Sequence, residues 1–111
     1  MEYSLDCRTD AVVVAVSGRV DEASWTSFGT GLREAIQQAG HAGIAKVIID
    51  FTELEYMSSR GLRVLTVAKR EGDEAGVGLT LASPNQVMRE ILAISRYDKL
   101  FTITDTVEAA R

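Results

Sequence analysis

The sequence has 111 residues, of which 46% are hydrophobic and 25% charged, the composition of an ordinary globular protein. This length indicates one domain covering residues 1–111, long enough to bury a core. The formal net charge of −4 argues against nucleic acid and an anionic membrane surface as partners, because both attract basic patches.

Cysteine and histidine each occur once, as Cys7 and His41. A single cysteine excludes an internal disulfide, and one of each does not make a zinc site, so we expect no metal. No basic start followed by an apolar core marks a signal peptide. The longest apolar run, residues 11–16, is far shorter than the ~20 residues of a membrane helix. We therefore expect a cytoplasmic protein without a membrane association.

The first half of the chain predicts two strands, a helix and a third strand. Residues 3–8 alternate like a half-buried strand, and residues 11–17 are an apolar strand that ends at Gly18; the short link predicts an antiparallel hairpin. Asp21 or Ser24 is the candidate cap of a helix that ends at Gly40. Residues 44–50 form the next strand, and the order strand, helix, strand predicts a right-handed crossover between two parallel strands. The helix that ends at Gly40 has one apolar face, made of Trp25, Phe28, Leu32, Ala35, Ile36 and Ala39.

Two serines follow the central strand. Ser58 and Ser59 precede an apolar helical pattern that starts at Leu62 and is expected to end near Gly72, with residues 73–76 as a turn. A helix start carries unpaired N–H donors and a partial positive charge. Two hydroxyls in this place are either helix caps or groups on which a partner acts.

The second half continues the alternation. Residues 77–81 predict a strand, Ser83-Pro84 a helix start, residues 100–103 a short strand, and Thr104 or Asp105 the cap of a terminal helix. The order β-β-α-β-α-β-α-β-α predicts an α/β fold with a mostly parallel sheet and an antiparallel N-terminal hairpin. The inner face of the helix after Pro84 is expected to be Val87, Met88, Ile91 and Leu92.

Enzyme motifs are absent. The chain has no GxxxxGK[ST] loop, no GxGxxG and no GxSxG elbow, so we expect neither a cofactor nor catalysis. His41 is the one imidazole that could activate a serine, and strand polarity places it at the opposite edge of the sheet. Asp50 either contacts a ligand, accepts a phosphoryl group as in receiver domains, or bonds the turn that follows it.

Residues 49–65 resemble the signature of STAS domains (sulfate transporter and anti-sigma factor antagonist). That signature is an apolar strand ending in Asp, a Ser or Thr two residues on, an apolar tract, and then Asp-Ser-Ser/Thr-Gly-Leu. Here the segment reads IDFTELEYMSSRGLRVL. Residues 17–21 resemble the family's Gly-x-apolar-Asp turn, and residues 97–103 its closing element. The resemblance spans essentially the whole chain and implies a STAS-like fold.

Stand-alone domains of this kind resemble anti-sigma factor antagonists, which implies partner switching. The unphosphorylated domain would bind an anti-sigma factor that is also a serine kinase with a histidine-kinase-like ATPase fold, and a PP2C-type phosphatase would reset the switch. By position in the motif, Ser59 is the implied phosphoacceptor, with Ser58 as its rival. The implied partner contacts are Asp21, Ser58, Arg60 and Gly61.

The motif departs from the family pattern at two positions. Ser58 stands where the family has an acid, and Arg60 where it has a small residue. Losing the acid removes a negative charge beside the acceptor, and Arg60 offers a cation that could pair with a phosphate. Two alternatives stay open: both serines only cap the helix, or the protein is a non-switching STAS adaptor or ligand-binding module in a transport or signalling assembly.

Overall fold

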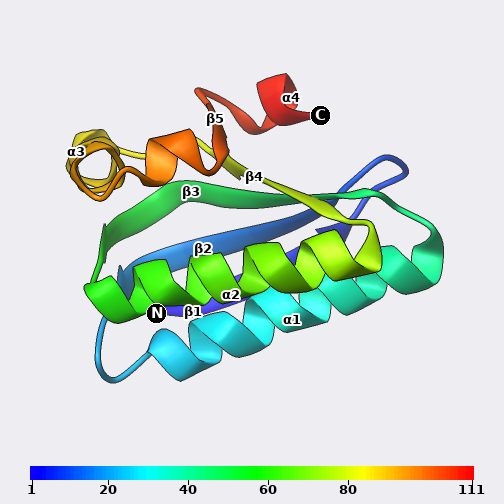
Figure 1. Ribbon diagram of the computed structural model, residues 1–111, viewed down its shortest axis with the longest axis horizontal. Coiled ribbons are helices and arrows are strands. Elements are labelled where there is room, and N and C mark those ends of the chain that lie inside the picture. The colour runs from blue at the N-terminus through cyan, green and yellow to red at the C-terminus, as the bar shows by residue number, and fades with distance from the viewer.

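The computed structural model describes residues 1–111 and contains five strands, four α-helices and one 3-10 turn (Figure 1). The strands are β1 (Glu2–Cys7), β2 (Val12–Val20), β3 (Lys46–Met57), β4 (Gly78–Ala82) and β5 (Thr102–Thr104). The helices are α1 (Trp25–Ala42), α2 (Ser59–Ala75), α3 (Gln86–Ile94) and α4 (Val107–Ala110), with the 3-10 turn η1 (Tyr97–Lys99) after α3.

The strands form one sheet in the order β1-β2-β3-β4-β5. Only β1 and β2 pair antiparallel, and all other neighbours are parallel. The helices α1 and α2 lie side by side along one face, whereas α3, η1 and α4 lie on the other side of β3 and β4 in this view (Figure 1). This confirms the predicted α/β fold and the order of its elements.

Both faces of the central strands are buried. Val14 and Ile49 belong to the main core with Phe28 of α1, while Val13 and Ile48 belong to a smaller cluster with α4. Successive side chains of a strand point to opposite faces. The unbroken apolar runs of β2 and β3 therefore match a sheet that is covered on two sides.

The strands β2 and β3 are longer than the sequence predicts. Gly18 does not end β2, and Asp50 does not end β3; both strands continue and pair as far as Val20 and Met57. The register shifts between Ala15 and Ser17 and again between Gly18 and Arg19, and Gly18 has a φ of 83°. Glycine adopts this conformation at little cost and so accommodates a bulge within the strand. The extension carries the chain out to the two serines.

The helices α1 and α2 also continue past their expected ends. Gly40 and Gly72 lie inside the helices, and the actual ends are Gly43 and Gly76, whose φ values are 70° and 73°. Left-handed glycine is a common helix terminator. Gly72 has another role, because a Cβ there would lie 2.5 Å from the carbonyl oxygen of Val77. Residues 73–75 are therefore helix, not turn.

The start of α3 lies at Asn85, not at Ser83. The Asn85 side chain accepts a hydrogen bond from the Met88 N–H at 2.8 Å, as an N-cap does. Ser83 instead has a left-handed backbone with a φ of 57°. Val87, expected on the inner face of this helix, is 49% exposed, and the buried side chains of α3 are those of Met88 and Leu92.

The last two elements are also displaced along the sequence. β5 starts at Thr102, after the η1 turn, and not at Leu100. The cap of α4 is Thr106, whose hydroxyl accepts a hydrogen bond from the Ala109 N–H at 3.0 Å. The predicted caps, Thr104 and Asp105, precede it and do not cap the helix.

Candidate functional site

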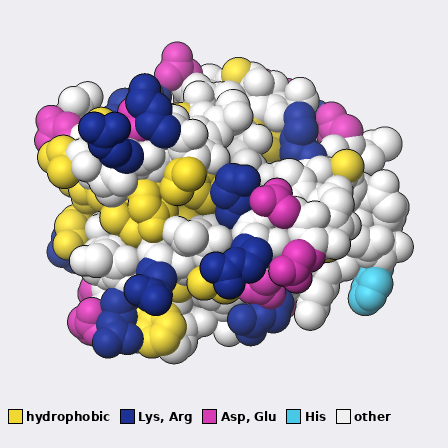
Figure 2. All heavy atoms as spheres, viewed as in Figure 1, with side chains coloured by type: hydrophobic (Ala, Val, Ile, Leu, Met, Phe, Trp, Pro, Cys, Tyr) yellow, Lys and Arg dark blue, Asp and Glu magenta, His cyan; other side chains and the backbone are white.

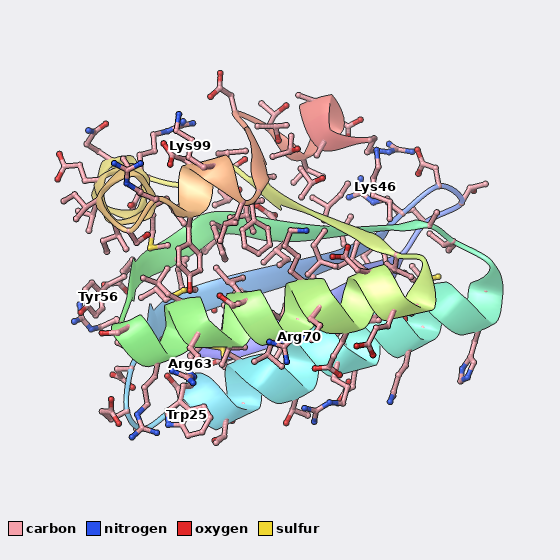
Figure 3. All side chains as sticks on the ribbon, viewed as in Figure 1. Trp25, Lys46, Tyr56, Arg63, Arg70 and Lys99 are labelled. Carbon is pink, nitrogen blue, oxygen red and sulfur yellow. The ribbon has the colours of Figure 1, made fainter.

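The two serines lie where the parallel strands end at their carboxyl edge. β2 ends at Val20 and β3 at Met57, and the Ser58 N–H donates a hydrogen bond to the Val20 carbonyl at 2.8 Å. The turn before α1 and the start of α2 are therefore adjacent. In Figure 3, Trp25, Tyr56 and Arg63 gather at this end of the molecule, away from Lys46. Open parallel sheets commonly bind their ligands at this edge.

Ser58 occupies the N-cap position of α2 without capping it. Its backbone is extended, with φ −78° and ψ 173°, and its side chain forms no cap hydrogen bond. The Oγ atom has less than 1 Å² of accessible surface and no hydrogen-bond partner. A buried hydroxyl without a partner is uncommon. The interpretation of Ser58 as a side-chain cap is therefore wrong for this structure.

Ser59 is the first residue of α2, and its side chain is exposed. The first turns of a helix present unpaired N–H groups and a partial positive charge. No acidic residue lies in the first turn of α2 to offset that charge. The surroundings of the Ser59 hydroxyl therefore favour a group that carries negative charge.

Arg60 connects the start of α2 to the turn before α1. Its Nε lies 3.2 Å from Glu22 Oε2, and its Cζ lies 5.2 Å from the centre of the Trp25 ring. The two charged side chains are 56% and 74% exposed, and exposed ion pairs contribute only about 0.2–1 kcal/mol. Arg60 is thus held loosely enough to change partner. No pattern in the sequence predicts the contact of Glu22 with Arg60. Trp25 packs partly buried against the main core, as its place on the apolar face of α1 predicts, and also contacts Arg60.

Gly61 is buried between the two strand ends. A Cβ at this position would overlap Met57 Cγ and lie 2.8 Å from Val20 Cγ1. Only glycine allows α2 to approach the sheet so closely, which explains the glycine of the motif in physical terms. Its contact with a partner remains a prediction.

Asp21 shapes the turn between β2 and α1. Its Oδ1 accepts a hydrogen bond from the Ala23 N–H at 3.0 Å and lies 3.1 Å from Ser24 Oγ. Ser24 Oγ also lies 2.9 Å from the Arg19 carbonyl oxygen and does not cap α1 with its side chain. Both candidate caps therefore fix the turn instead, and the partner contact of Asp21 remains a prediction.

Asn85 is a site residue that sequence reasoning missed. Its amide donates hydrogen bonds to the carbonyl oxygens of Leu54 at 3.0 Å and Glu55 at 3.4 Å, while its Oδ1 caps α3. One side chain thus fastens α3 to the part of β3 that leads to the serines. The signal was available, because asparagine is as good an N-cap as serine.

Asp50 and His41 lie outside this site. Asp50 Oδ1 accepts hydrogen bonds from the N–H of Thr52 at 3.0 Å and from its hydroxyl at 2.6 Å, as the third interpretation of Asp50 predicts. His41 is in the last turn of α1, about 24 Å along the helix from Trp25, so it is not placed to activate the serines.

No group of three or more His, Cys, Asp or Glu side chains is arranged to hold a metal ion. None of the helices combines the length and the apolar character needed to cross a membrane.

The fold and the serine-bearing helix start define a STAS domain: the sequence pattern of that family matches residues 2–110, and the chain belongs to the family. BtrV of Bordetella bronchiseptica, provisionally named an anti-sigma factor antagonist, is 24% identical over 110 residues, which are 99% of this chain and 91% of BtrV.

Solved structures share the fold. An anti-sigma factor antagonist from Mycobacterium paratuberculosis has a TM-score of 0.81 at 21% identity, covering 98% of this chain and 89% of its own. The anti-sigma factor antagonist SpoIIAA in its unphosphorylated form has a TM-score of 0.79 at 22% identity, with 98% and 92% covered. Phosphorylated SpoIIAA from Bacillus has a TM-score of 0.70 at 23% identity, with 98% and 96% covered.

Proposed function

We propose that this protein is an anti-sigma factor antagonist that acts by partner switching. Unphosphorylated, it binds an anti-sigma factor that is also a serine kinase with a histidine-kinase-like ATPase fold. Phosphorylation of Ser59 separates the pair, and a PP2C-type phosphatase restores the binding form. The observation that carries this proposal is the exposed Ser59 hydroxyl at the start of α2, in a STAS domain whose relatives include named antagonists.

Accessibility favours Ser59 over Ser58 as the acceptor. In phosphoryl transfer the serine oxygen must approach the γ-phosphate of ATP in line with the leaving group. The Ser58 oxygen is buried, so a kinase would reach it only after the helix start had moved. Ser59 needs no such movement. The related SpoIIAA exists in a phosphorylated form, which supports a modifiable surface in this family.

A phosphate on Ser59 would be tolerated within the domain and opposed at an interface. It adds about −1.5 to −2 charges and three acceptor oxygens. The start of α2 favours an anion, and Arg60 and Arg63 lie one and four residues further along the helix. Against a docked partner, the same group adds bulk and a desolvation cost. A loss of 3 kcal/mol would weaken binding by about 150-fold.

The two departures from the motif favour the phosphorylated state. Serine at position 58 removes the negative charge that the family places beside the acceptor. The guanidinium of Arg60, now paired with the exposed Glu22, can exchange that carboxylate for a phosphate of higher charge.

Phosphorylation in vitro of wild type and of single-serine variants tests this function. The protein is incubated with a serine-kinase anti-sigma factor from the same genome and MgATP, and the modified residue is located by mass spectrometry. We expect wild type and Ser58→Ala to be phosphorylated and Ser59→Ala to remain unmodified. Absence of phosphate on wild type, or equal modification of Ser59→Ala, contradicts the assignment.

The second candidate function is a non-switching STAS adaptor or ligand-binding module in a transport or signalling assembly. The contacts of Arg60 with Glu22 and Trp25 favour it, because they fill a place that the family leaves to a small residue. Binding of Ser59→Glu distinguishes the two functions: a switching antagonist loses affinity for its partner, and a non-switching module keeps it.

A further inference from the structure

The exposed face of α2 carries a stripe of side chains that starts at the proposed acceptor. Ser59, Arg63, Val67 and Arg70 lie at helical spacings of four, four and three, so they project from one face. All four are exposed, including 41% of the apolar Val67. In Figure 3 the side chains of Arg63 and Arg70 stand over the junction of α2 with α1. No element of the protein covers this stripe.

A hollow of about 890 Å³ accompanies the stripe, and we call it the α2 groove. Its charged lining residues are all cations, and its apolar ones include an exposed valine and two aromatic residues. They are Arg33, Arg60, Arg63, Val67, Trp25 and Tyr97. Figure 2 shows Lys and Arg side chains over α1 and α2, whereas the larger group of hydrophobic side chains lies between α2 and the α3–η1 region, on the other side of α2.

The positive charge of the α2 groove is only partly neutralised. Arg33 pairs with Glu71 and Arg60 with Glu22, but Arg63 pairs with no acid in the structure, and neither does Arg70, which lies beside the groove on the same face of α2. The chain as a whole carries a net charge of −4. A cationic, partly apolar surface on an acidic protein selects for a partner of opposite charge.

We propose that the α2 groove binds an amphipathic helix of a protein partner whose apolar stripe is bordered by aspartate and glutamate. The apolar stripe would cover Val67, Trp25 and Tyr97, and its acids would pair with Arg63 and Arg70. Helices commonly dock in apolar grooves in this way, through side chains spaced three and four residues apart. The inference rests on the proposed function in taking this partner to be the anti-sigma factor, and it specifies the chemistry of the contact.

This chemistry also explains release. A phosphate on Ser59 lies four residues before Arg63, a spacing at which opposite charges on a helix pair. It therefore competes with the acids of the partner for the same guanidinium and adds like charge at the end of the groove. Phosphorylation would act through electrostatics at Arg63 as well as through bulk at Ser59.

Two synthetic 18-residue helical peptides test the proposal without the natural partner. They share one leucine stripe, which is bordered by glutamate in one peptide and by lysine in the other. Binding is followed by the fluorescence of Trp25, the single tryptophan of the chain, and by anisotropy of the labelled peptide. We expect the glutamate peptide to bind at least tenfold tighter than the lysine peptide at low salt, with the difference shrinking as salt rises.

Matched variants locate the contact. Arg63→Gln with Arg70→Gln lowers the net charge by two, and so does Gln37→Glu with Gln38→Glu on the exposed side of α1. We expect the first pair to weaken binding of the glutamate peptide at least tenfold and the second to leave it within about twofold. Circular dichroism checks that both variants remain folded.

Equal binding of the two peptides, or unchanged binding by the Arg63→Gln/Arg70→Gln variant, overturns the proposal. Self-association that this variant abolishes would assign the groove to a second copy of the chain and would overturn it too. These peptides need no kinase. Failure of Ser59 phosphorylation therefore leaves their result intact, and failure of peptide binding leaves the phosphorylation result intact.

Discussion

Different contacts stabilise the two ends of the sheet, that is, the amino and the carboxyl ends of its parallel strands. At the amino end, α1 and α2 finish at the left-handed glycines Gly43 and Gly76, and an exposed ion pair joins Asp10 to Arg111. At the carboxyl end, closure depends on Asn85, which bonds two carbonyls of β3, and on Gly61, which leaves no room for a Cβ. Many sequences can supply a glycine cap or a surface ion pair. Few can supply the contacts of the carboxyl end, so substitutions there should have the larger effects.

The largest effect is expected from Gly61→Ala. The added Cβ would overlap Met57 Cγ and press on Val20 Cγ1, and overpacking of this kind costs about 1–3 kcal/mol. Urea unfolding gives the change in free energy. The control is Gly40→Ala, in α1 near the amino end, where a Cβ meets nothing within 4 Å. That variant should gain about 0.5–1 kcal/mol, because alanine favours a helix over glycine. Equal destabilisation by both substitutions would remove the contrast between the ends.

Asn85→Ala should have the next largest effect. It removes the cap of α3 and the bonds to Leu54 and Glu55, and loss of a cap alone costs about 0.5–2 kcal/mol. Asn85→Asp keeps the capping oxygen and loses the amide donor, so its destabilisation separates the bonds to β3 from the cap. Hydrogen exchange of the β3 extension should rise in both variants. Unchanged exchange would show that Asn85 stabilises α3 alone.

Ser58→Ala should have a smaller effect of opposite sign. A buried polar group without a partner costs free energy, of the order of 1–3 kcal/mol, and Ser58 Oγ is such a group. We expect a gain of about 0.5–1 kcal/mol in unfolding free energy. The neighbouring Ser59→Ala, at an exposed position, should change stability by less than about 0.5 kcal/mol. A marked loss of stability in Ser58→Ala would show that the hydroxyl is satisfied in solution.

The smallest effect is expected at the amino end, as a dependence on pH. The hydrogen bond from Arg111 lowers the pKa of the Asp10 carboxyl below its ordinary value of 3.8. A carboxyl whose pKa is lower in the folded than in the unfolded protein adds stability above its unfolded pKa. That contribution is lost as the pH falls from about 4 through the folded pKa. Urea midpoints between pH 6 and 2 should fall slightly more for wild type than for Asp10→Asn, and parallel curves would contradict this.

The order of the elements could be read from the sequence because local patterns encode it. The apolar run of β3 and the helical spacing from Leu62 both survive in the structure, and the motif places the serines at the helix start. The ends of the elements could not be read in the same way. Gly72 is predicted to end a helix, but it lies inside α2. The absence of a Cβ there leaves room for the carbonyl of Val77, a residue beyond the end of α2 that packs against the helix.

The candidate site also combines residues that a contiguous motif predicts with residues that meet only in the folded chain. Ser59, Ser58 and Arg60 follow from a contiguous motif, whereas Asn85 reaches β3 across about thirty residues of sequence, and Glu22 and Trp25 meet Arg60 only when two helices start side by side.

Hydrophobic periodicity and a short motif are local properties of the chain, and they are enough to predict the fold class, the family and the position of the serine pair. Which serine oxygen is exposed depends on contacts between distant segments. The Ser58 N–H bonds to the end of β2 and the Ser58 hydroxyl is buried, whereas Ser59, one residue further along the helix, is exposed. The packing of three separate elements also creates the open groove that Arg63 and Val67 share with Trp25 and Tyr97.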